Sequence, residues 1–364
     1  MAISPIPSSS LSGVKLAYAT PSLGMHENHT LPLKLKAVSK HGYAGVEMGF
    51  DDLCSYAEQT FGDEFKGEDD IPTLVKTAEK VYELCQELKL EVICLQPFSD
   101  FEGITDPTER SARFETAKNW MAIMRALHTP MLQIGSTDNP SRSSSYTTIA
   151  CDLRELADLI AAKVPNGRIA YEPWCWGAWI DTWRGCWEIC KLVDRPNFGL
   201  CLDTFQSVGR EWADPTSESG RIEEGGITEE KLTARLQYSM EELAKTVDPE
   251  KIFYFQISDA YHMQPPLTPD HEEMKANEGT PARGVWSHAF RPLPFDDELK
   301  GSKKGYLPIK ECLKAVFATG WRGWVSMEVF EGEEMGKENE SVPDEWARRG
   351  KKSWEGCVAA MAEE

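Results

Sequence analysis

The chain lacks several features that would place it in other classes of protein. No hydrophobic run reaches the roughly 18 to 20 residues that a membrane-spanning helix needs, so we expect no membrane partner. Basic residues are scarce: 39 Lys and Arg stand against 59 Asp and Glu, and the formal net charge of −20 argues against binding to nucleic acid. The N-terminus shows neither the basic nor the apolar region of a secretion signal, which favours a cytoplasmic protein.

Several chemical motifs are also absent. The chain has no glycine-rich phosphate-binding loop, no Gly-x-Ser-x-Gly sequence and no Cys-x-x-Cys pair. Its ten cysteines lie mostly in apolar segments, as Cys94 and Cys201 do, which is typical of buried free thiols in a cytosolic protein.

Eight apolar segments rich in β-branched and aromatic residues predict strands covered on both faces. They are Lys15–Ser22, Gly45–Phe50, Glu91–Phe98, Met131–Ser136, Arg168–Trp174, Phe198–Phe205, Ile252–Ala260 and Gly323–Phe330. Helical patterns alternate with them at Leu33–His41, Ile71–Leu88, Glu109–Leu127, Thr148–Val164, Thr182–Val193, Thr228–Val247, Leu307–Thr319 and Pro343–Ala362. This alternation is typical of α/β proteins and predicts a (β/α)8 TIM barrel.

We expect one barrel domain over residues 14–364, preceded by a flexible lead of Ser- and Pro-rich residues 1–13. Three segments that follow strands are longer than a bare barrel needs: Asp51–Asp70, Gly209–Gly226 and Tyr261–Tyr306. They belong to the C-terminal face, where barrel active sites lie. The third is the predicted long insertion after strand 7, and its length suggests an active-site lid.

Four of the predicted strands carry one oxygen-bearing side chain near the C-terminal end: Glu172, Asp203, Gln256 and Glu328. A carboxylate or amide buried alone in an apolar segment is costly, but four of them can share one divalent cation. Three carboxylates and an amide oxygen are hard donors that favour Mg²⁺ or Mn²⁺, with Co²⁺ or Zn²⁺ as alternatives. The competing interpretation is that backbone groups or an arginine satisfy each acid separately.

Other residues are predicted to reach the same mouth. Trp174 follows Glu172 closely and would form a wall of the pocket. His26 follows the first strand, and Glu47 lies near the end of the second, so both are candidates for a role in the site.

The chain resembles the xylose isomerase-like barrel superfamily, and within it the fungal 3-dehydroshikimate dehydratases of quinate catabolism. The matching stretches are Cys94–Phe98, Val193–Phe205, Ala213–Ser217, Trp286–Ser287 with Arg291, Tyr306–Lys310 and Gly323–Glu328. The resemblance implies that the four oxygen-bearing residues are metal ligands. It also implies that Ser287 and Arg291 hold the substrate.

The chain departs from this family at three positions. Many members carry a His three residues after the metal-binding Asp, where this chain has Gln206, which cannot act as a general base. Met25 stands where an Arg often follows the first-strand Ser-Leu-Gly, and His288 replaces the Arg after Trp-Ser. The loss of two cations weakens the case for a carboxylate substrate, whereas His26 and His288 are candidates for the acid/base group.

The resemblance implies a metal-dependent hydro-lyase that dehydrates 3-dehydroshikimate, or a related cyclic hydroxy-ketone, to protocatechuate. The alternative is a sugar isomerase or ketose 3-epimerase that acts through a metal-bound enediolate, with Glu172 and Glu328 as paired acid/base groups. The substrate is a small hydroxy-ketone in either case, and the sequence gives no indication of the oligomeric state.

Overall fold

The computed structural model describes residues 3–298 and 304–363. Eight parallel strands close into a barrel in the order in which they occur in the chain, with the last strand pairing with the first. They are β1 (Lys15–Ala19), β2 (Gly45–Gly49), β3 (Glu91–Phe98), β4 (Met131–Gly135), β5 (Arg168–Glu172), β6 (Phe198–Asp203), β7 (Ile252–Ile257) and β9 (Trp324–Met327). The prediction of a (β/α)8 TIM barrel is therefore confirmed.

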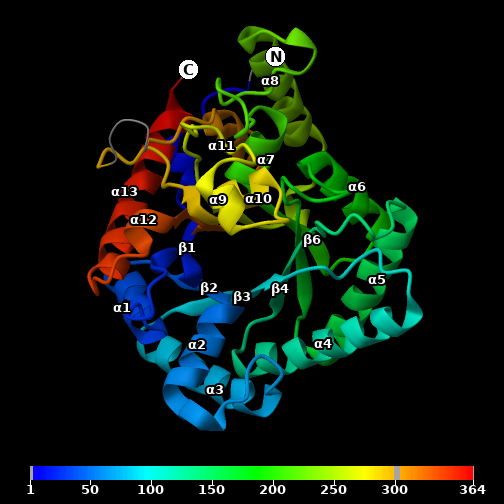
Figure 1. The fold of residues 1–364 in the computed structure, drawn as a ribbon, viewed down its shortest axis with the longest axis vertical. Helices are drawn as coiled ribbons and strands as arrows, with labels where there is room; N and C mark the ends of the chain where they lie inside the picture. Colours follow the sequence, from blue (N-terminus) through cyan, green and yellow to red (C-terminus); the bar gives the residue numbers. More distant parts are fainter. Residues whose placement is uncertain (1–2, 299–303, 364) are drawn as a thin grey trace.

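Helices surround the barrel (Figure 1). They are α1 (Leu31–Lys40), α2 (Phe50–Phe61), α3 (Ile71–Glu87), α4 (Pro107–Ala126), α5 (Tyr146–Lys163), α6 (Trp183–Val193), α7 (Thr204–Glu211), α8 (Glu229–Thr246), α11 (Ile309–Ala318) and α13 (Val342–Ala362). Short 3-10 turns lie at Ser8–Leu11, Thr20–Leu23, Gly62–Glu64, Glu224–Gly226 and Pro249–Lys251. Among the described residues no helix combines the length and the apolar character needed to cross a bilayer.

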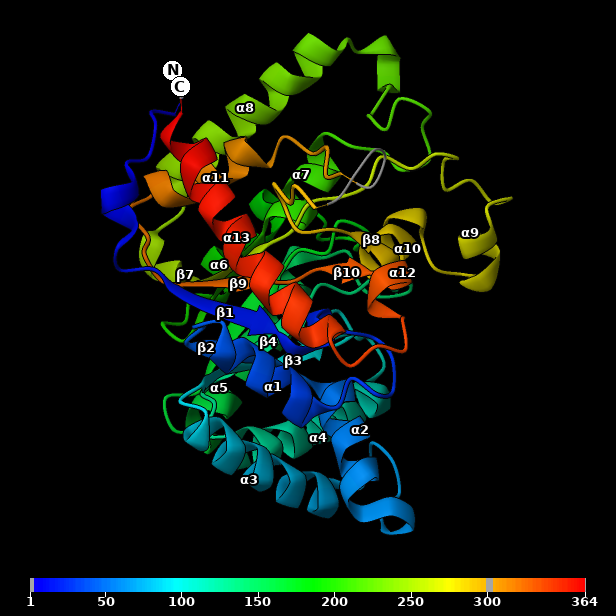
Figure 2. The same cartoon turned by 90° about the vertical axis from the view of Figure 1, so that its left-hand side faces the viewer.

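Five short elements gather at the carboxyl ends of the strands. They are α9 (Glu272–Ala276), α10 (Ala282–Ala289), β8 (Phe290–Arg291), β10 (Phe330–Glu331) and α12 (Gly332–Met335). Figure 2 shows them together at one end of the barrel. Strands β8 and β10 pair in antiparallel fashion, with Arg291 opposite Phe330, and so join the segment after β7 to the segment after β9.

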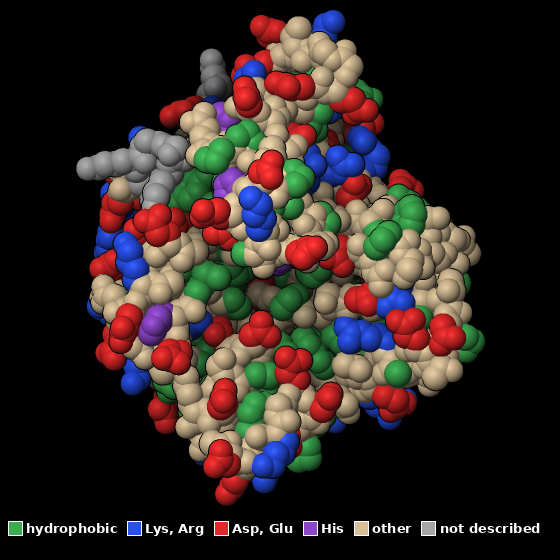
Figure 3. Space-filling model, viewed as in Figure 1, with side chains coloured by type: hydrophobic (Ala, Val, Ile, Leu, Met, Phe, Trp, Pro, Cys, Tyr) green, Lys and Arg blue, Asp and Glu red, His purple; other side chains and the backbone are tan. Residues whose placement is uncertain are grey.

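Two hydrophobic cores hold the barrel. The larger one lies between the strands and the helices, and the smaller one fills the interior of the barrel. The smaller core is made of Ala17, Ile93, Cys94, Met131, Ala170, Cys201, Tyr254 and Trp324. Because side chains alternate along a strand, the next inward residues towards the carboxyl ends form the layer above this core. Buried polar residues, among them Glu47, Gln133, Glu172, Asp203 and Gln256, occupy that layer. On the surface above it, at the carboxyl ends of the strands, Figure 3 shows hydrophobic side chains at the centre and acidic side chains around them.

The structure corrects several predicted boundaries. The segment Phe198–Phe205 is a strand only to Asp203, because the Asp203 side chain accepts a hydrogen bond from the Gln206 N–H and caps α7. The first strand ends at Ala19, where a 3-10 turn begins. The segment Asp51–Asp70 is largely helix α2, and Gly209–Gly226 begins inside α7. The segment Tyr261–Tyr306 contains α9, α10 and β8, while its residues 299–303 lie outside the described residues.

The predicted lead contacts the C-terminal helix. Ile6 and Leu11 are buried in the larger core, and the Ile6 N–H donates a hydrogen bond to the Met361 carbonyl at 2.9 Å. The described ends of the chain therefore lie side by side (Figure 2). The division into a lead and a barrel domain remains our proposal.

Candidate metal centre at the carboxyl ends of the strands

Three of the four predicted ligands converge at the mouth of the barrel. Glu172 ends β5, Asp203 ends β6, and Glu328 follows β9. One carboxylate oxygen from each lies within 4.8 Å of the others, and all three side chains are buried. Parallel strands bring their carboxyl ends to the same edge, which is why residues far apart in the sequence meet here.

Gln256, the fourth predicted ligand, lies in register with Asp203 on one side and Ser326 on the other. Its Nε2 donates a hydrogen bond to Glu47 Oε2 at 2.8 Å, and its Oε1 accepts one from Cys201 Sγ at 3.0 Å. The amide therefore adjoins the acidic cluster, but in this structure its oxygen faces Cys201. Glu47 is itself fully buried and lies in the middle of β2.

The acidic cluster is electrostatically costly without a cation. Burial raises the pKa of Glu172 well above its usual value, and the neighbouring Glu328 raises it further. Burial also raises the pKa of Glu328 to about 7, although Arg291 opposes this shift. The pKa of Asp203 is raised for the same reason, again against the effect of Arg291. Buried carboxylates with raised pKa values bind a proton or a divalent ion more readily than they remain ionised without a partner.

The chemistry of the residues fits a divalent ion. The buried Oε1 of Glu172 has no hydrogen-bond partner among the described residues, so one ligand position is free. Three carboxylates and the Arg291 guanidinium leave a formal charge of −2, which one divalent cation would cancel. Oxygen donors of this kind suit Mg²⁺ or Mn²⁺.

Arg291 lies against the acids rather than apart from them. Its Nη2 pairs with Asp203 Oδ2 at 2.5 Å and with Glu328 Oε2 at 3.0 Å, and its side chain is 1% exposed. The ring of Phe205 packs on the guanidinium with 4.6 Å between the ring centre and Cζ. An arginine does therefore compensate two of the acids, as the competing interpretation of the sequence required, but Glu172 keeps an unpartnered oxygen.

Two serines fix the guanidinium. Ser258 Oγ accepts hydrogen bonds from Arg291 Nη2 at 2.8 Å and from Nε at 3.1 Å. Ser287 Oγ accepts one from Nη1 at 3.3 Å. Helix α10 and strand β8 thus carry the predicted pair Ser287 and Arg291 to the acids, and Ser258 is an additional partner that sequence reasoning missed.

Aromatic side chains form one side of the centre. The Nε1 of Trp174 donates a hydrogen bond to Glu172 Oε2 at 3.1 Å, and its ring stacks on Trp176 with centroids 4.9 Å apart. Trp174 lies over Gly135, where any Cβ would come within 2.0 Å of the indole. Trp176 in turn meets the ring of His288 edge-on at 5.6 Å. A wall of two tryptophans and one histidine therefore runs from Glu172 to α10.

The two candidate acid/base histidines are in different places. His288 lies on α10 beside the aromatic wall, where burial and then Arg291 lower its pKa. His26 is half-buried and contacts Asn28 and His29. It lines a separate cavity of about 380 Å³ between α1 and α2. The structure places His288 beside Trp176 and within reach of the charge of Arg291, whereas His26 lines the separate cavity.

Gln206 has a defined role in the packing of the site. Its Oε1 accepts a hydrogen bond from the Cys175 N–H at 2.9 Å and so holds the segment that carries Trp174 and Trp176. Gln133 on β4 was not singled out from the sequence, yet its Nε2 donates a hydrogen bond to Glu172 Oε2. The signal was available, because Gln133 is an amide inside an apolar strand, like Gln256.

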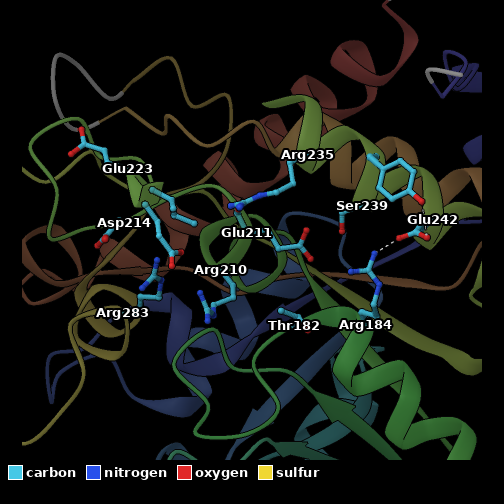
Figure 4. A pocket seen from close by; sticks show the side chains of 13 residues that line it. Thr182, Arg184, Arg210, Glu211, Asp214, Glu223, Arg235, Ser239, Glu242 and Arg283 are labelled. Atoms are coloured by element: carbon cyan, nitrogen blue, oxygen red, sulfur yellow. Dashed lines mark hydrogen bonds and ion pairs between the residues drawn. The ribbon is translucent and has the colours of Figure 1, made fainter. Parts of the chain in front are cut away.

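A cavity of about 590 Å³ lies apart from the acidic cluster, among α6, α7, α8 and α10. Figure 4 shows Arg184, Arg210, Arg235 and Arg283 around it, together with Glu211, Asp214 and Glu242. Arg184 pairs with Glu242, and the lining contains none of the predicted site residues. The candidate functional site is therefore the acidic cluster at the barrel mouth and not this cavity.

Metal affinity is expected to fall as the pH falls from 8 to 6. Protons compete with the cation for Glu328, whose pKa is raised to about 7, and for Glu172, whose pKa is raised well above its usual value. Each displaced proton contributes up to about a tenfold loss of affinity per pH unit below the pKa. Calorimetric titration with Mn²⁺ at pH 6, 7 and 8 measures the effect. An affinity that does not change with pH would show that these carboxylates are not the ligands.

Comparison with known proteins agrees with this architecture. Residues 35–353 match the family model described as xylose isomerase-like TIM barrel. A 3-dehydroshikimate dehydratase of Neurospora crassa is 38% identical over 345 residues, which cover 93% of this chain and 92% of the relative. A protein of the same name from Pseudomonas aeruginosa is 30% identical over 83% of this chain, but the match spans only 36% of that longer relative.

Among solved structures, an IOLI protein with a bound zinc atom superposes with a TM-score of 0.63 at 19% identity. The match covers 95% of this chain and 98% of that protein. At this level of identity the likeness shows the fold alone.

Proposed function

The chain belongs to the xylose isomerase-like TIM-barrel family, and we propose that within this family it is a metal-dependent lyase that dehydrates 3-dehydroshikimate to protocatechuate. The observation that carries the proposal is the meeting of Glu172, Asp203, Glu328 and Arg291 at one point of the barrel mouth. The similarity to the Neurospora crassa dehydratase over 93% of the chain supports the choice of substrate. A related cyclic hydroxy-ketone would suit the same residues.

Glu172, Asp203, Gln256 and Glu328 would hold the ion, with Gln256 presenting its amide oxygen. When bound, Mg²⁺ or Mn²⁺ supplies Lewis-acid polarisation of a ketone oxygen, which makes the neighbouring hydrogen more acidic. To present its amide oxygen to the ion, Gln256 would have to turn its amide group, because its oxygen now accepts a hydrogen bond from Cys201 and its nitrogen donates one to Glu47 Oε2 at 2.8 Å.

Arg291 is suited to a carboxylate group on the substrate. Nε and Nη2 of Arg291 are engaged by Ser258, Asp203 and Glu328, so Nη1 is the edge that would face a substrate carboxylate, and Phe205 keeps the plane of the guanidinium fixed. Ser287 would add a hydroxyl contact from the same element. Trp174 and Trp176 would pack against the ring of the substrate and keep water away from the reacting carbon.

We favour His288 as the base that removes the hydrogen next to the ketone. Its lowered pKa keeps the imidazole neutral at pH 7, so it can accept a proton. As the C–H bond breaks, its electron pair forms a double bond, and the β-hydroxyl leaves as water with the proton that His288 has taken up. His26 remains the alternative base, although it lines a different cavity.

One observation favours the second candidate, a sugar isomerase or ketose 3-epimerase. Glu172 and Glu328 face each other within 4.8 Å, and both have raised pKa values, as a pair that exchanges protons with two faces of a substrate requires. The presence of Gln206 in place of the family histidine also favours this reaction.

Product identity separates the two reactions. The protein loaded with Mg²⁺ or Mn²⁺ is incubated with 3-dehydroshikimate and, separately, with a free ketose such as D-fructose. We expect the cyclic acid to lose one water and the ketose to stay unchanged. Mass spectrometry and proton NMR measure the two outcomes. Untouched 3-dehydroshikimate together with a ketose epimerised at C3, or isomerised at C2, would establish the second candidate instead.

A further inference from the structure

Two glutamines on neighbouring strands each carry a buried polar atom without a hydrogen-bond partner among the described residues. They are Gln96 on β3, whose Nε2 is unpartnered, and Gln133 on β4, whose Oε1 is unpartnered. Their side chains are 3% and 1% exposed. Buried polar groups in folded proteins are almost always paired, so an unpaired one usually marks a bound water, an ion or a ligand.

Both side chains point into the barrel. Gln133 reaches Glu172 with its Nε2, which places it in the layer of the acidic cluster. Cys94, two residues before Gln96, contacts Glu47 and Tyr254 inside the barrel, whereas Leu95 between them packs in the outer core. Since successive side chains of a strand alternate between faces, Gln96 also faces inward.

The two glutamines are neighbours across the β3–β4 ladder. Leu95 pairs with Leu132 and Phe98 with Ile134, and the register shifts between these pairs, so that Gln96 and Pro97 together lie opposite Gln133. Gln96 offers an amide N–H and Gln133 an amide carbonyl, and neither group has a hydrogen-bond partner in residues 3–298 and 304–363. A hydroxyl group can accept from the first and donate to the second, so it matches this pair in a way that a carboxylate or a cation does not.

The pair lies on the side of the mouth opposite Arg291. In the closed order of strands, β3 and β4 stand across the barrel from β7 and β9. Arg291 makes its contacts on that far side, with Ser258 after β7 and Glu328 after β9. On the side of β7 and β9, the Arg291 guanidinium therefore pairs with the polar groups of the mouth. On the side of β3 and β4, Gln96 Nε2 and Gln133 Oε1 have no partner among the described residues.

We infer that Gln96 and Gln133 bind a hydroxyl group of the substrate and so determine its specificity for hydroxylated ketones. This inference rests on the proposed function, because it takes the substrate to be a hydroxy-ketone that lies between Arg291 and the two amides. Leaving either amide unpaired against a substrate without that hydroxyl is costly, which is how such a pair discriminates.

The test uses Gln96→Met and Gln133→Met, which keep the length of the side chain but remove the amide. The matched control is Thr129→Val, because the hydroxyl of Thr129 is also buried and unpartnered but lies at the opposite end of β4. For each protein, kcat/KM is measured with the hydroxy-ketone, together with inhibition constants of analogues that each lack one ring hydroxyl. Melting temperatures are recorded in parallel.

We expect each Met variant to lose about tenfold or more in kcat/KM through KM, as the loss of one hydrogen bond to a substrate hydroxyl predicts. The variants should also bind one deoxy analogue as well as the wild type does. The control should match the wild type in KM. If the glutamines only hold a structural water, the melting temperature falls while KM stays unchanged, and the inference is wrong.

The outcome remains distinguishable from failure of the proposed function. A wild type that epimerises a ketose and ignores 3-dehydroshikimate contradicts the dehydratase assignment, but the same variants should then raise KM for the ketose. A wild type that binds neither compound overturns the inference together with the assignment.

Discussion

Replacing Asp203 with asparagine is expected to abolish metal binding and to lower turnover by about a thousandfold or more, since metal-ion polarisation contributes several kcal/mol to such reactions. Asn keeps the volume of Asp203 and an oxygen that can accept the hydrogen bond from the Gln206 N–H, so the cap of α7 should survive. The melting temperature of the metal-free protein should fall less than that of Arg291→Ala, because Arg291 keeps its pair with Glu328 and the repulsion between Asp203 and Glu172 is removed. Calorimetry with Mn²⁺ and a steady-state assay measure the two effects.

The matched control for this change is Asp259→Asn. Asp259 is also buried beyond the end of β7, but it accepts hydrogen bonds from the Ala260 and Leu307 N–H groups and is not part of the acidic cluster. We expect the control to bind one Mn²⁺ with the affinity of the wild type. Normal Mn²⁺ binding by Asp203→Asn would show that the cluster is not the metal site.

Arg291→Lys is expected to impair turnover of 3-dehydroshikimate nearly as much as Arg291→Ala, by about a hundredfold in kcat/KM. A lysine ammonium is a point charge that cannot replace the planar fork, and it cannot stack on Phe205 or satisfy Ser258 as the guanidinium does. Steady-state kinetics measure the effect. Arg349→Lys serves as the control, because Arg349 pairs with the buried Asp296 away from the cluster.

The Arg291 variants should also show how much Arg291 and the metal ion each contribute to the stability of the acidic cluster. Arg291→Ala leaves Asp203 and Glu328 without their cation, and breaking a buried pair in this way costs about 3 to 5 kcal/mol. We therefore expect a lower melting temperature without metal and recovery of much of the loss with Mn²⁺. Wild-type kcat/KM in Arg291→Ala would rule out a contact between Arg291 and a substrate carboxylate.

The acidic cluster could be predicted because its members follow one simple rule. Glu172, Asp203 and Glu328 each stand at or just beyond the end of an apolar strand, and parallel strands of a barrel bring those positions together. The fold followed from the same alternation of strands and helices. The resemblance to known dehydratases, and not the spacing, directed attention to Ser287 and Arg291.

Other features could not be predicted because they depend on side-chain direction or on the path of a loop. The amide of Gln256 lies where expected, but only the structure shows that its nitrogen faces Glu47. His26 lies in the loop after the first strand and His288 on α10, and only the structure shows that His26 lines a separate cavity whereas His288 meets the ring of Trp176. Ser258 was missed because its role is a hydrogen bond to Arg291, which is distant in the sequence and lies beside it only in the folded protein.

Dehydration of 3-dehydroshikimate by the metal-free protein during a titration with Mn²⁺ tests the central claim most directly. The ultraviolet absorbance of the aromatic product reports the rate. The account predicts no turnover after chelation, a rate that rises to a plateau at one Mn²⁺ per chain, and the same plateau position for Asp259→Asn. Undiminished turnover in the chelated protein, or no aromatic product at any concentration of metal, would contradict it.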